Sequence, residues 1–210
     1  MLFDMETLSS TDTYKLLVAT VVPRPIAWVT TIDQHGALNA APFSFFNAMS
    51  GSPHIVRFGI GGRTPGDAKD TGNNIRRTGQ FVVNLVNEEC APQMNISAIE
   101  FDQAINELSE AGLTPVRSVK VKPPRIAESP VNMECERLVL LDVGIDRTIV
   151  VGRVLAMHVR DEAVIDPVKC YIDTPKLNLI GRMHGRGWYV RTTDRFEVPR
   201  IDVRDWHGRE

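Results

Sequence analysis

Residues 39–48 read NAAPFSFFNA, and this stretch decides between a plain strand and a more specialised segment. Phe43 and Phe45 alternate as in a strand, but Pro42 cannot donate a backbone hydrogen bond and Phe46 breaks the alternation. One interpretation is a kinked edge strand over a core. The other is a segment that leaves the sheet so that its backbone and its small side chains can contact a ligand.

The composition is that of an ordinary globular protein, with 210 residues, 43% hydrophobic and 24% charged, and a net charge of -2. No linker or repeat divides the chain, so we expect a single domain over residues 1–210. Lysines and arginines are scattered, which argues against a nucleic-acid partner or a basic membrane patch. No signal peptide is visible and no apolar stretch approaches the ~20 residues of a membrane span, so we expect a cytoplasmic protein.

Strand patterns dominate the chain. Strands are expected at 26–32, 37–46, 54–60, 80–86, 118–122, 133–144, 148–160 and around 164–165. Helices are expected from Ser10 or Thr11, from Asp70 or Thr71, and in two pieces over 88–111, the second beginning at Phe101. Six or seven strands with few helices between them favour a mainly β antiparallel barrel with helical additions over a βαβ sheet.

Two neighbouring segments suggest phosphate binding. The loop GGRTPGD (61–67) has the glycine spacing of a P-loop, but Asp67 stands where lysine is required, so a flexible loop is the better interpretation. Lys69, Asp70 and Thr71 stand at the expected start of a helix, whose free N–H groups and positive dipole end attract anions. This trio suits a terminal phosphate monoester, and the alternative is a capped surface helix with a solvated lysine.

Other catalytic centres are not indicated. The histidines are scattered, and Cys90, Cys135 and Cys170 have no metal or redox spacing, so we expect no metal site and three reduced thiols. Ser44 has no G-x-S-x-G context, so we expect no hydrolase nucleophile.

A planar ligand remains as a possibility. Small residues beside a proline let a flat ring lie close to the main chain, whose N–H groups can bond the ring, as a flavin requires. Further polar groups for such a ring are Thr30, Thr31, Ser44 and Asn47.

Three segments taken together resemble the flavin reductase-like family of FMN-binding split-barrel proteins: PRPIAWVTTID (23–33), NAAPFSFFNA (39–48) and KDTGNNIRRTGQFVVN (69–84). The long form of that family also has a C-terminal segment like LNLIGRMHGRGWYVRTT (177–193). The resemblance covers about residues 14–193, with extensions at both ends. It implies a six-stranded antiparallel split barrel that forms a homodimer, with FMN in a groove at or near the dimer interface.

Carried onto this chain, the resemblance also implies cofactor contacts. Thr30 and Thr31 would end a strand beside the flavin, and Lys69 and Thr71 would hold the phosphate with Asn74 nearby. The run from Asn39 to Asn47, Pro42 included, would line the ring, and its polar edge would bond the main chain of Ala41, Phe43, Ser44 and Phe46. Weaker candidates for the pocket or the nicotinamide side are Arg24, Arg182, His184 and Tyr189.

The activity implied by the resemblance is hydride transfer from NADH or NADPH to FMN, in which the cofactor does the chemistry and no catalytic side chain is needed. Some members supply reduced FMN to a partner monooxygenase. Two alternatives stay open: a non-catalytic FMN-binding electron-transfer protein of the same fold, and a split-barrel protein with another cofactor, such as haem, or none. His54 stands where family members commonly have a second proline, so the start of the strand at 54–60 is expected to differ.

Overall fold

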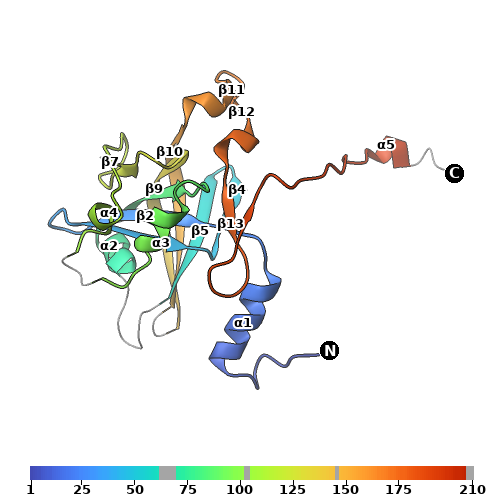
Figure 1. Cartoon of the computed structure of the whole chain (residues 1–210), viewed down its shortest axis with the longest axis horizontal. Coiled ribbons are helices and arrows are strands. Elements are labelled where there is room, and N and C mark those ends of the chain that lie inside the picture. Colours follow the sequence, from blue (N-terminus) through green and yellow to red (C-terminus); the bar gives the residue numbers. More distant parts are fainter. Residues whose placement is uncertain (62–69, 102–104, 145–146, 207–210) are drawn as a thin grey trace.

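The computed structural model describes residues 1–61, 70–101, 105–144 and 147–206, and strands form its centre (Figure 1). The helices are α1 (Ser10–Thr20), α2 (Asp70–Thr78), α3 (Ala91–Ile96), α4 (Glu107–Glu110) and α5 (Val203–Trp206), with 3₁₀ turns at Asp161–Ala163 and Thr174–Leu177. The strands are β1 (Arg24–Pro25), β2 (Ala27–Ile32), β3 (Leu38–Phe43), β4 (Phe46–Gly51), β5 (His54–Gly61), β6 (Gln80–Leu85), β7 (Pro115–Val116), β8 (Arg125–Ile126), β9 (Val131–Gly144), β10 (Arg147–Val159), β11 (Val164–Asp166), β12 (Tyr171–Ile172), β13 (Ile180–Arg182) and β14 (Tyr189–Arg191).

Seven strands form one antiparallel sheet in the order β3-β2-β6-β9-β10-β5-β4. Its two edge strands, β3 and β4, are consecutive in the chain and are joined only by Ser44 and Phe45. The sheet therefore closes through one bent strand instead of a hydrogen-bonded ladder, which makes a split barrel. When β3 and β4 are counted as that one strand, the barrel has six strands, and the predicted mainly β fold is confirmed.

The bend between β3 and β4 follows from the directions of three phenylalanines. Phe43 is buried inside the barrel and Phe46 packs against the same core, so two inward positions are separated by two residues instead of one. Phe45 lies outside, over Gly59, and is 47% exposed. The prediction of one continuous strand over 37–46 is therefore wrong, because the side chains change face within it.

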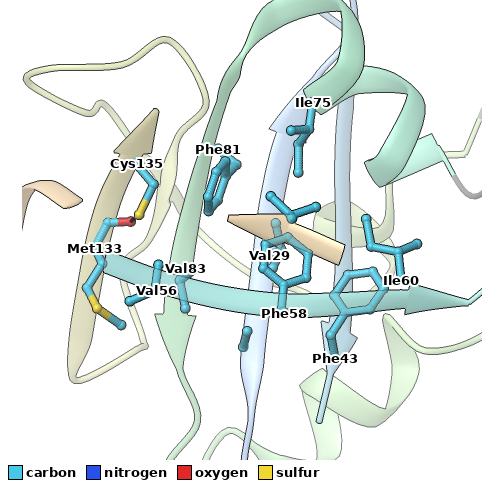
Figure 2. Close-up of a cluster of buried hydrophobic side chains, with 12 residues drawn as sticks. Val29, Phe43, Val56, Phe58, Ile60, Ile75, Phe81, Val83, Met133 and Cys135 are labelled. Atoms are coloured by element: carbon cyan, nitrogen blue, oxygen red, sulfur yellow. Dashed lines mark hydrogen bonds between the residues drawn. The ribbon is translucent and has the colours of Figure 1, made fainter. Parts of the chain in front are cut away.

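Aromatic and branched side chains fill the barrel interior (Figure 2). The ring of Phe58 is fully buried and lies with its centroid 5.3 Å from that of Phe43 and 5.5 Å from that of Phe81. Tilted and edge-on pairs at these distances stabilise a core beyond their area burial alone. The fully buried Ile75 of α2 adds to this cluster, so α2 closes one end of the barrel.

A second core lies outside the barrel, between the β2–β3 hairpin and the helices α3 and α4. Trp28 of β2 is fully buried there, and its indole N–H donates to Ser97 Oγ at 2.8 Å. Ser97 in turn donates to the carbonyl of Met94 in α3 at 2.8 Å. This chain of hydrogen bonds fixes α3 against the barrel wall.

The predicted strand at 118–122 does not form. The N–H groups of Val119 and Lys120 donate to the carboxylate of Glu134, at 2.9 and 2.5 Å, and that side chain is fully buried. The segment therefore bends around a carboxylate instead of pairing with a strand. Local hydrogen bonds of this kind compete with regular structure.

The second predicted helical piece within 88–111 is much shorter than expected. In the described part of it, only α4 is helical, and residues 102–104 lie outside the described ranges. The side chain of Asn106 accepts the N–H of Leu108 at 3.1 Å and caps α4, so the helix starts where this cap places it.

Helix α1 and strand β5 lie close to their predicted bounds. The cap of α1 is Ser9, one residue before the predicted Ser10, because its hydroxyl accepts the N–H of Asp12 at 3.1 Å. At the start of β5, the Nδ1 of His54 bonds the carbonyl of Gly51 at 2.7 Å and closes the turn from β4. None of the helices among the described residues is both long and apolar enough to cross a membrane.

Replacing Gly152 by alanine tests the packing of the barrel. A Cβ at Gly152 of β10 would overlap the fully buried ring of Phe81 and come within 3.3 Å of the Glu136 carbonyl oxygen. We expect Gly152→Ala to lower the free energy of unfolding by about 1–3 kcal/mol, measured by chemical denaturation. In the control Gly144→Ala the new Cβ meets Arg147 atoms at 3.8 Å, an ordinary van der Waals contact, so a change within about 0.5 kcal/mol is expected. Equal losses in both variants would contradict this account.

Candidate functional site

The predicted cofactor residues fall into two groups joined by β3. One group lies at the end of the barrel where β2 ends and α2 begins, and it contains Thr30, Thr31, Asn39, Thr71 and Asn74. The other lies at the bend beyond Phe43 and contains Ser44, Phe46 and Asn47, with Arg24 beside them. Ala41 and Pro42 lie between the groups on β3, and Lys69 lies outside the described residues.

Asn39 is the centre of a buried polar network in the first group. Its Oδ1 accepts from the hydroxyls of Thr31 at 3.2 Å and Thr71 at 2.8 Å, and its Nδ2 donates to Glu107 Oε1 at 2.9 Å. Asn74 Nδ2 donates to Thr31 Oγ1 at 3.0 Å. Because the hydroxyl hydrogen of Thr71 is used inside the protein, its main-chain N–H at the start of α2 is the donor that it can offer an anion.

Glu107 fixes this network and gave no signal in the sequence. It is 6% exposed, and its second oxygen accepts the N–H of Ala40 at 3.2 Å. Burial raises the pKa of Glu107, and the negative charge of Asp70 raises it further, while the hydrogen bonds from Ala40 and Asn39 oppose the shift. An acid at the start of a short helix is expected on a solvated surface, so its burial depends on the fold and is not visible in the local pattern.

Thr30 and Thr31 point to opposite faces of β2, as alternation along a strand requires. The hydroxyl of Thr30 is fully buried, donates to the carbonyl of Pro124 at 2.5 Å and accepts from Asn84 Nδ2 at 3.3 Å. Thr30 therefore holds the loop before β8 against the barrel, and within this pair only Thr31 joins the network around Asn39.

Two hollows meet at this end of β3. A polar one of about 230 Å³ is bordered by Asp33, Asp70, Arg77 and Glu107, and a smaller one of about 60 Å³ reaches the chain at Ala41 and Pro42. The start of α2 lies beside both, and the positive end of the helix dipole there favours an anion. The carboxylates of Asp33, Asp70 and Glu107 at the same place disfavour an anion, whereas the guanidinium of Arg77 favours one.

The second group borders a larger cleft, of about 400 Å³, between α1 and the outer face of the barrel. We call it the α1 cleft. Its lining is mostly apolar and includes Leu17 of α1, Val21 just after that helix, Phe45 of the bend and Ile149 of β10. Its polar and charged lining side chains are Arg24, Ser44, Asn47 and Arg57. An apolar concave surface with few polar groups is the usual form of a small-molecule site.

Arg24 lines the α1 cleft, and its guanidinium forms hydrogen bonds within the protein. Its Nη1 donates to the carbonyls of Val18 at 2.8 Å and Val21 at 2.6 Å, and its Nη2 donates to the carbonyl of Met183 at 3.0 Å. It is 6% exposed, and burial lowers its pKa. Arg24 therefore ties the C-terminal end of α1 to the β13–β14 hairpin and sets the width of the cleft, while Ser44 Oγ lies 3.5 Å from its Nε.

The three C-terminal candidates lie on or beside the β13–β14 hairpin, next to the cleft and not in its lining. The guanidinium of Arg182 stacks 4.7 Å from the ring centroid of Tyr189 and donates to the carbonyl of Gly185 at 3.0 Å. The ring of His184 stacks on Trp188, with centroids 6.2 Å apart and an interplanar angle of 14°. Arg182 and Tyr189 are thus ordered against each other, and His184 is ordered against Trp188.

The backbone of the opening segment offers different groups on its two sides. The N–H of Ala40 points away from β2 to Glu107. Because main-chain groups alternate in direction along a strand, those of Ala41 and Phe43 point toward β2 and pair with it. The carbonyl of Phe45 accepts from Gly59 N–H, so the main chain of Phe46 points away from β5 to the free edge of β4. The free main-chain groups therefore lie at the bend and at the outer edge of β3.

The other two kinds of site to consider are a metal centre and a reactive thiol. Within the described ranges, no group of three or more His, Cys, Asp or Glu side chains is arranged to hold a metal ion. The three cysteines are free thiols, of which Cys90 and Cys135 are buried and Cys170 is exposed. Burial raises the pKa of Cys90 to about 11, and it raises the pKa of Cys135 as well, so both are inert as nucleophiles.

Residues 19–174 match the protein family described as "Flavin reductase like domain". Among curated proteins, an uncharacterized protein of Deinococcus radiodurans is 41% identical over 97% of this chain and 91% of its own length. Among solved structures, 2-nitrobenzoate 2-nitroreductase NbaA of Pseudomonas fluorescens is 33% identical, with a TM-score of 0.88 over 97% of this chain and 98% of that one.

Two further structures are similar to this chain. Nitrilotriacetate monooxygenase component B of Bacillus cereus is 29% identical, with a TM-score of 0.88 over 94% of this chain and 98% of that one. A putative flavin reductase with a split barrel domain from Shewanella frigidimarina is 21% identical, with a TM-score of 0.80 over 96% of this chain and 100% of that one, and it shows the fold alone.

Glu107 should give the stability of this protein a specific pH dependence. Since its folded pKa is raised, the stabilisation that it provides is complete below its unfolded pKa of about 4.3 and is lost as the pH rises through the higher folded value. Glutamine does not titrate. The free energy of unfolding of the wild type minus that of Glu107→Gln should therefore decrease between about pH 4 and pH 8, measured by urea denaturation.

The matched control is Glu110→Gln, an exposed position on the same short helix. The difference between wild type and this control should not follow the pH trend seen for Glu107→Gln. A difference for Glu107→Gln that is constant or grows with pH would contradict the burial of a charged Glu107.

Proposed function

The chain belongs to the flavin reductase-like family, and on this basis we propose that it is an FMN-binding oxidoreductase of the cytoplasm that takes hydride from NADH or NADPH. The observation that carries the proposal is the arrangement around β3, where a helix start, a strand edge of small residues and an apolar cleft follow one another. Bound FMN would supply the hydride-accepting ring. The protein would bind and orient it.

The residues present fit a flavin mononucleotide along β3. From Asn39 to Ser44 an extended strand advances about 16 Å, which separates a polar end for the phosphate from an apolar end for the ring. At the polar end, the first turn of α2 and Lys69 would hold the phosphate. The charge of Lys69 matters there because Asp70 and Glu107 border the same hollow.

At the apolar end, the ring would lie against the bend. Pro42 and Ala41 have small side chains at a small hollow, and the main chain of Phe46 at the free edge of β4 is directed so that it can bond the ring edge. Ser44 and Asn47 add a hydroxyl and an amide at the mouth of the α1 cleft. We propose that the nicotinamide enters through this cleft, with Arg182, His184 and Tyr189 at its rim.

We further propose that the protein acts as a homodimer through the outer face of the barrel. Cross-strand pairing places Leu141 beside Ile149, and Val139 beside Val151, in two rows that continue across β5 to the α1 cleft. Leu141 is 49% exposed and Val143 61%. An apolar face of this kind on a soluble protein is typical of an interface. We call it the outer apolar face, made of Val139, Leu141, Val143, Ile149, Val151 and Phe45.

The electron acceptor has two candidates. The similarity to nitrilotriacetate monooxygenase component B favours reduced flavin delivered to a partner oxygenase. The similarity to a 2-nitrobenzoate reductase favours a small aromatic acid, and one observation supports it: Arg57 stands exposed at the apolar α1 cleft, and its guanidinium has no hydrogen bond or ion pair within the described part of the chain. A non-catalytic FMN-binding electron carrier is the remaining alternative.

The direct test is the visible spectrum of the purified protein after addition of FMN and removal of free flavin, followed by anaerobic NADH or NADPH. We expect flavin absorbance that bleaches with one of the two nicotinamides. Bound flavin that neither nicotinamide reduces would favour the electron carrier. The absence of flavin binding, or the spectrum of another cofactor such as haem, would contradict the proposal. In the same assay Lys69→Ala should weaken FMN binding tenfold or more, about 1.5–3 kcal/mol, while Lys15→Ala on α1 should not.

Replacing Leu141 by aspartate tests the outer apolar face. A charge in the centre of a desolvated interface opposes association, so Leu141→Asp should be monomeric at micromolar concentrations where the wild type is dimeric, by size-exclusion chromatography with light scattering. The control is Val168→Asp, a 91% exposed position between β11 and β12, which should leave the dimer intact. A folded Leu141→Asp variant that dimerises like the wild type would contradict the proposed interface.

A further inference from the structure

The last described part of the chain, residues 192–206, is an arm that runs away from the barrel and ends in the short helix α5 (Figure 1). The root of the arm is fixed, because Arg191 forms an ion pair with Glu88 and Thr192 Oγ1 donates to the carbonyl of Leu179 at 3.0 Å. Beyond Thr192, every hydrogen bond and ion pair found in the described residues stays within the arm itself.

The arm exposes apolar side chains in a regular pattern. In RFEVPRIDV (195–203), apolar and charged residues alternate, with one shift of phase at the proline. This alternation is typical of an extended segment with one face buried. Its apolar residues are nevertheless between 54% and 91% exposed in the single chain: Phe196, Val198, Ile201, Val203 and Trp206. The arm therefore has an apolar face that stays exposed in the described part of the single chain.

The arm is long enough to reach well beyond the body of its own chain. Fifteen extended residues span up to about 50 Å, whereas the radius of gyration expected for a chain of this size is about 17 Å. The span shared with the Pseudomonas fluorescens crystal structure omits only about 3% of this chain, about six residues, so it runs to at least about residue 204. The aligned span thus includes most of the arm.

We propose that the arm docks on a second copy of this chain, with its apolar side chains packed on the body of that copy. The charges of the arm alternate in sign, from Arg195 and Glu197 to Arg200, Asp202 and Arg204, which gives no preference for a nucleic acid or an anionic membrane. The body of the chain carries the outer apolar face, so a second copy supplies apolar surface. In a twofold dimer the contact forms twice, because the arm of each copy packs on the body of the other.

This inference concerns assembly and does not depend on flavin chemistry. A chain that ends after Thr193 should dissociate at a protein concentration at least tenfold higher than the full chain, measured by sedimentation velocity over a dilution series. The variant Phe196→Ser/Val198→Ser/Ile201→Ser/Val203→Ser should show the same shift. The matched control on the charged side, Glu197→Ser/Asp202→Ser, should shift the midpoint less than about threefold. FMN binding, measured in parallel on dimeric samples, separates a failure of this proposal from a failure of the proposed function.

Trypsin gives a second measurement on the intact full chain, because Arg195, Arg200 and Arg204 are cleavage sites within the arm. Mass spectrometry should show slow release of the arm at concentrations where the protein is dimeric, and at least tenfold faster release after dilution to monomer. Protection that does not change with concentration would overturn the proposal in favour of an arm folded on its own chain. Rapid release from the dimer, or dimerisation unaffected by truncation, would overturn it in favour of another partner.

Discussion

The structure depends on one strand that serves both edges of the same sheet. Since β3 pairs with β2 and β4 pairs with β5, the barrel closes at the bend without a hydrogen-bonded seam. The backbone groups on the outer side of this strand are thus left without a neighbouring strand. Unpaired edges are usually blocked in native proteins. Here Glu107 accepts the N–H of Ala40 and Pro42 has no N–H, so these two positions on the outer edge of β3 present no free donor.

Two buried carboxylates set the loops around that strand. Glu107 holds Asn39 and Ala40 at one end of β3, and Glu134 holds the N–H groups of Val119 and Lys120 on the other side of the barrel. Burying a charge is costly unless donors surround it. Each carboxylate is therefore stable only when its loop is in place, and the same contacts that satisfy the charge order α4 and the turn at 119–120. His158 Nε2, at 2.6 Å from Glu134, completes the second set.

Features that depend on local sequence patterns could be predicted, whereas features that depend on partners distant in the sequence could not. The barrel strands follow from alternation, and the sequence predicted most of them correctly. The segment at 118–122 alternates as well, yet Glu134 captures its amides, and that partner is distant in the sequence. The cofactor site itself stays a prediction. Its residues Thr31, Asn39, Thr71 and Asn74 do meet in one network, but the residue that orients the network, Glu107, looks in the sequence like any acid at a helix start.

The bend also links the site to the outer surface of the molecule. Because two residues separate Phe43 from Phe46, Phe45 is forced outside, where it joins the row of Gly59, Ile149 and Leu141. The α1 cleft and the outer apolar face are therefore parts of one surface, which share Phe45 and Ile149. The proposed hydride transfer would need no acid or base from the protein, so water would have to be kept from the reacting rings by protein surfaces alone. A second copy bound to this face would cover the adjoining cleft. The bend with its three phenylalanines would then affect both dimerisation and the proposed hydride transfer.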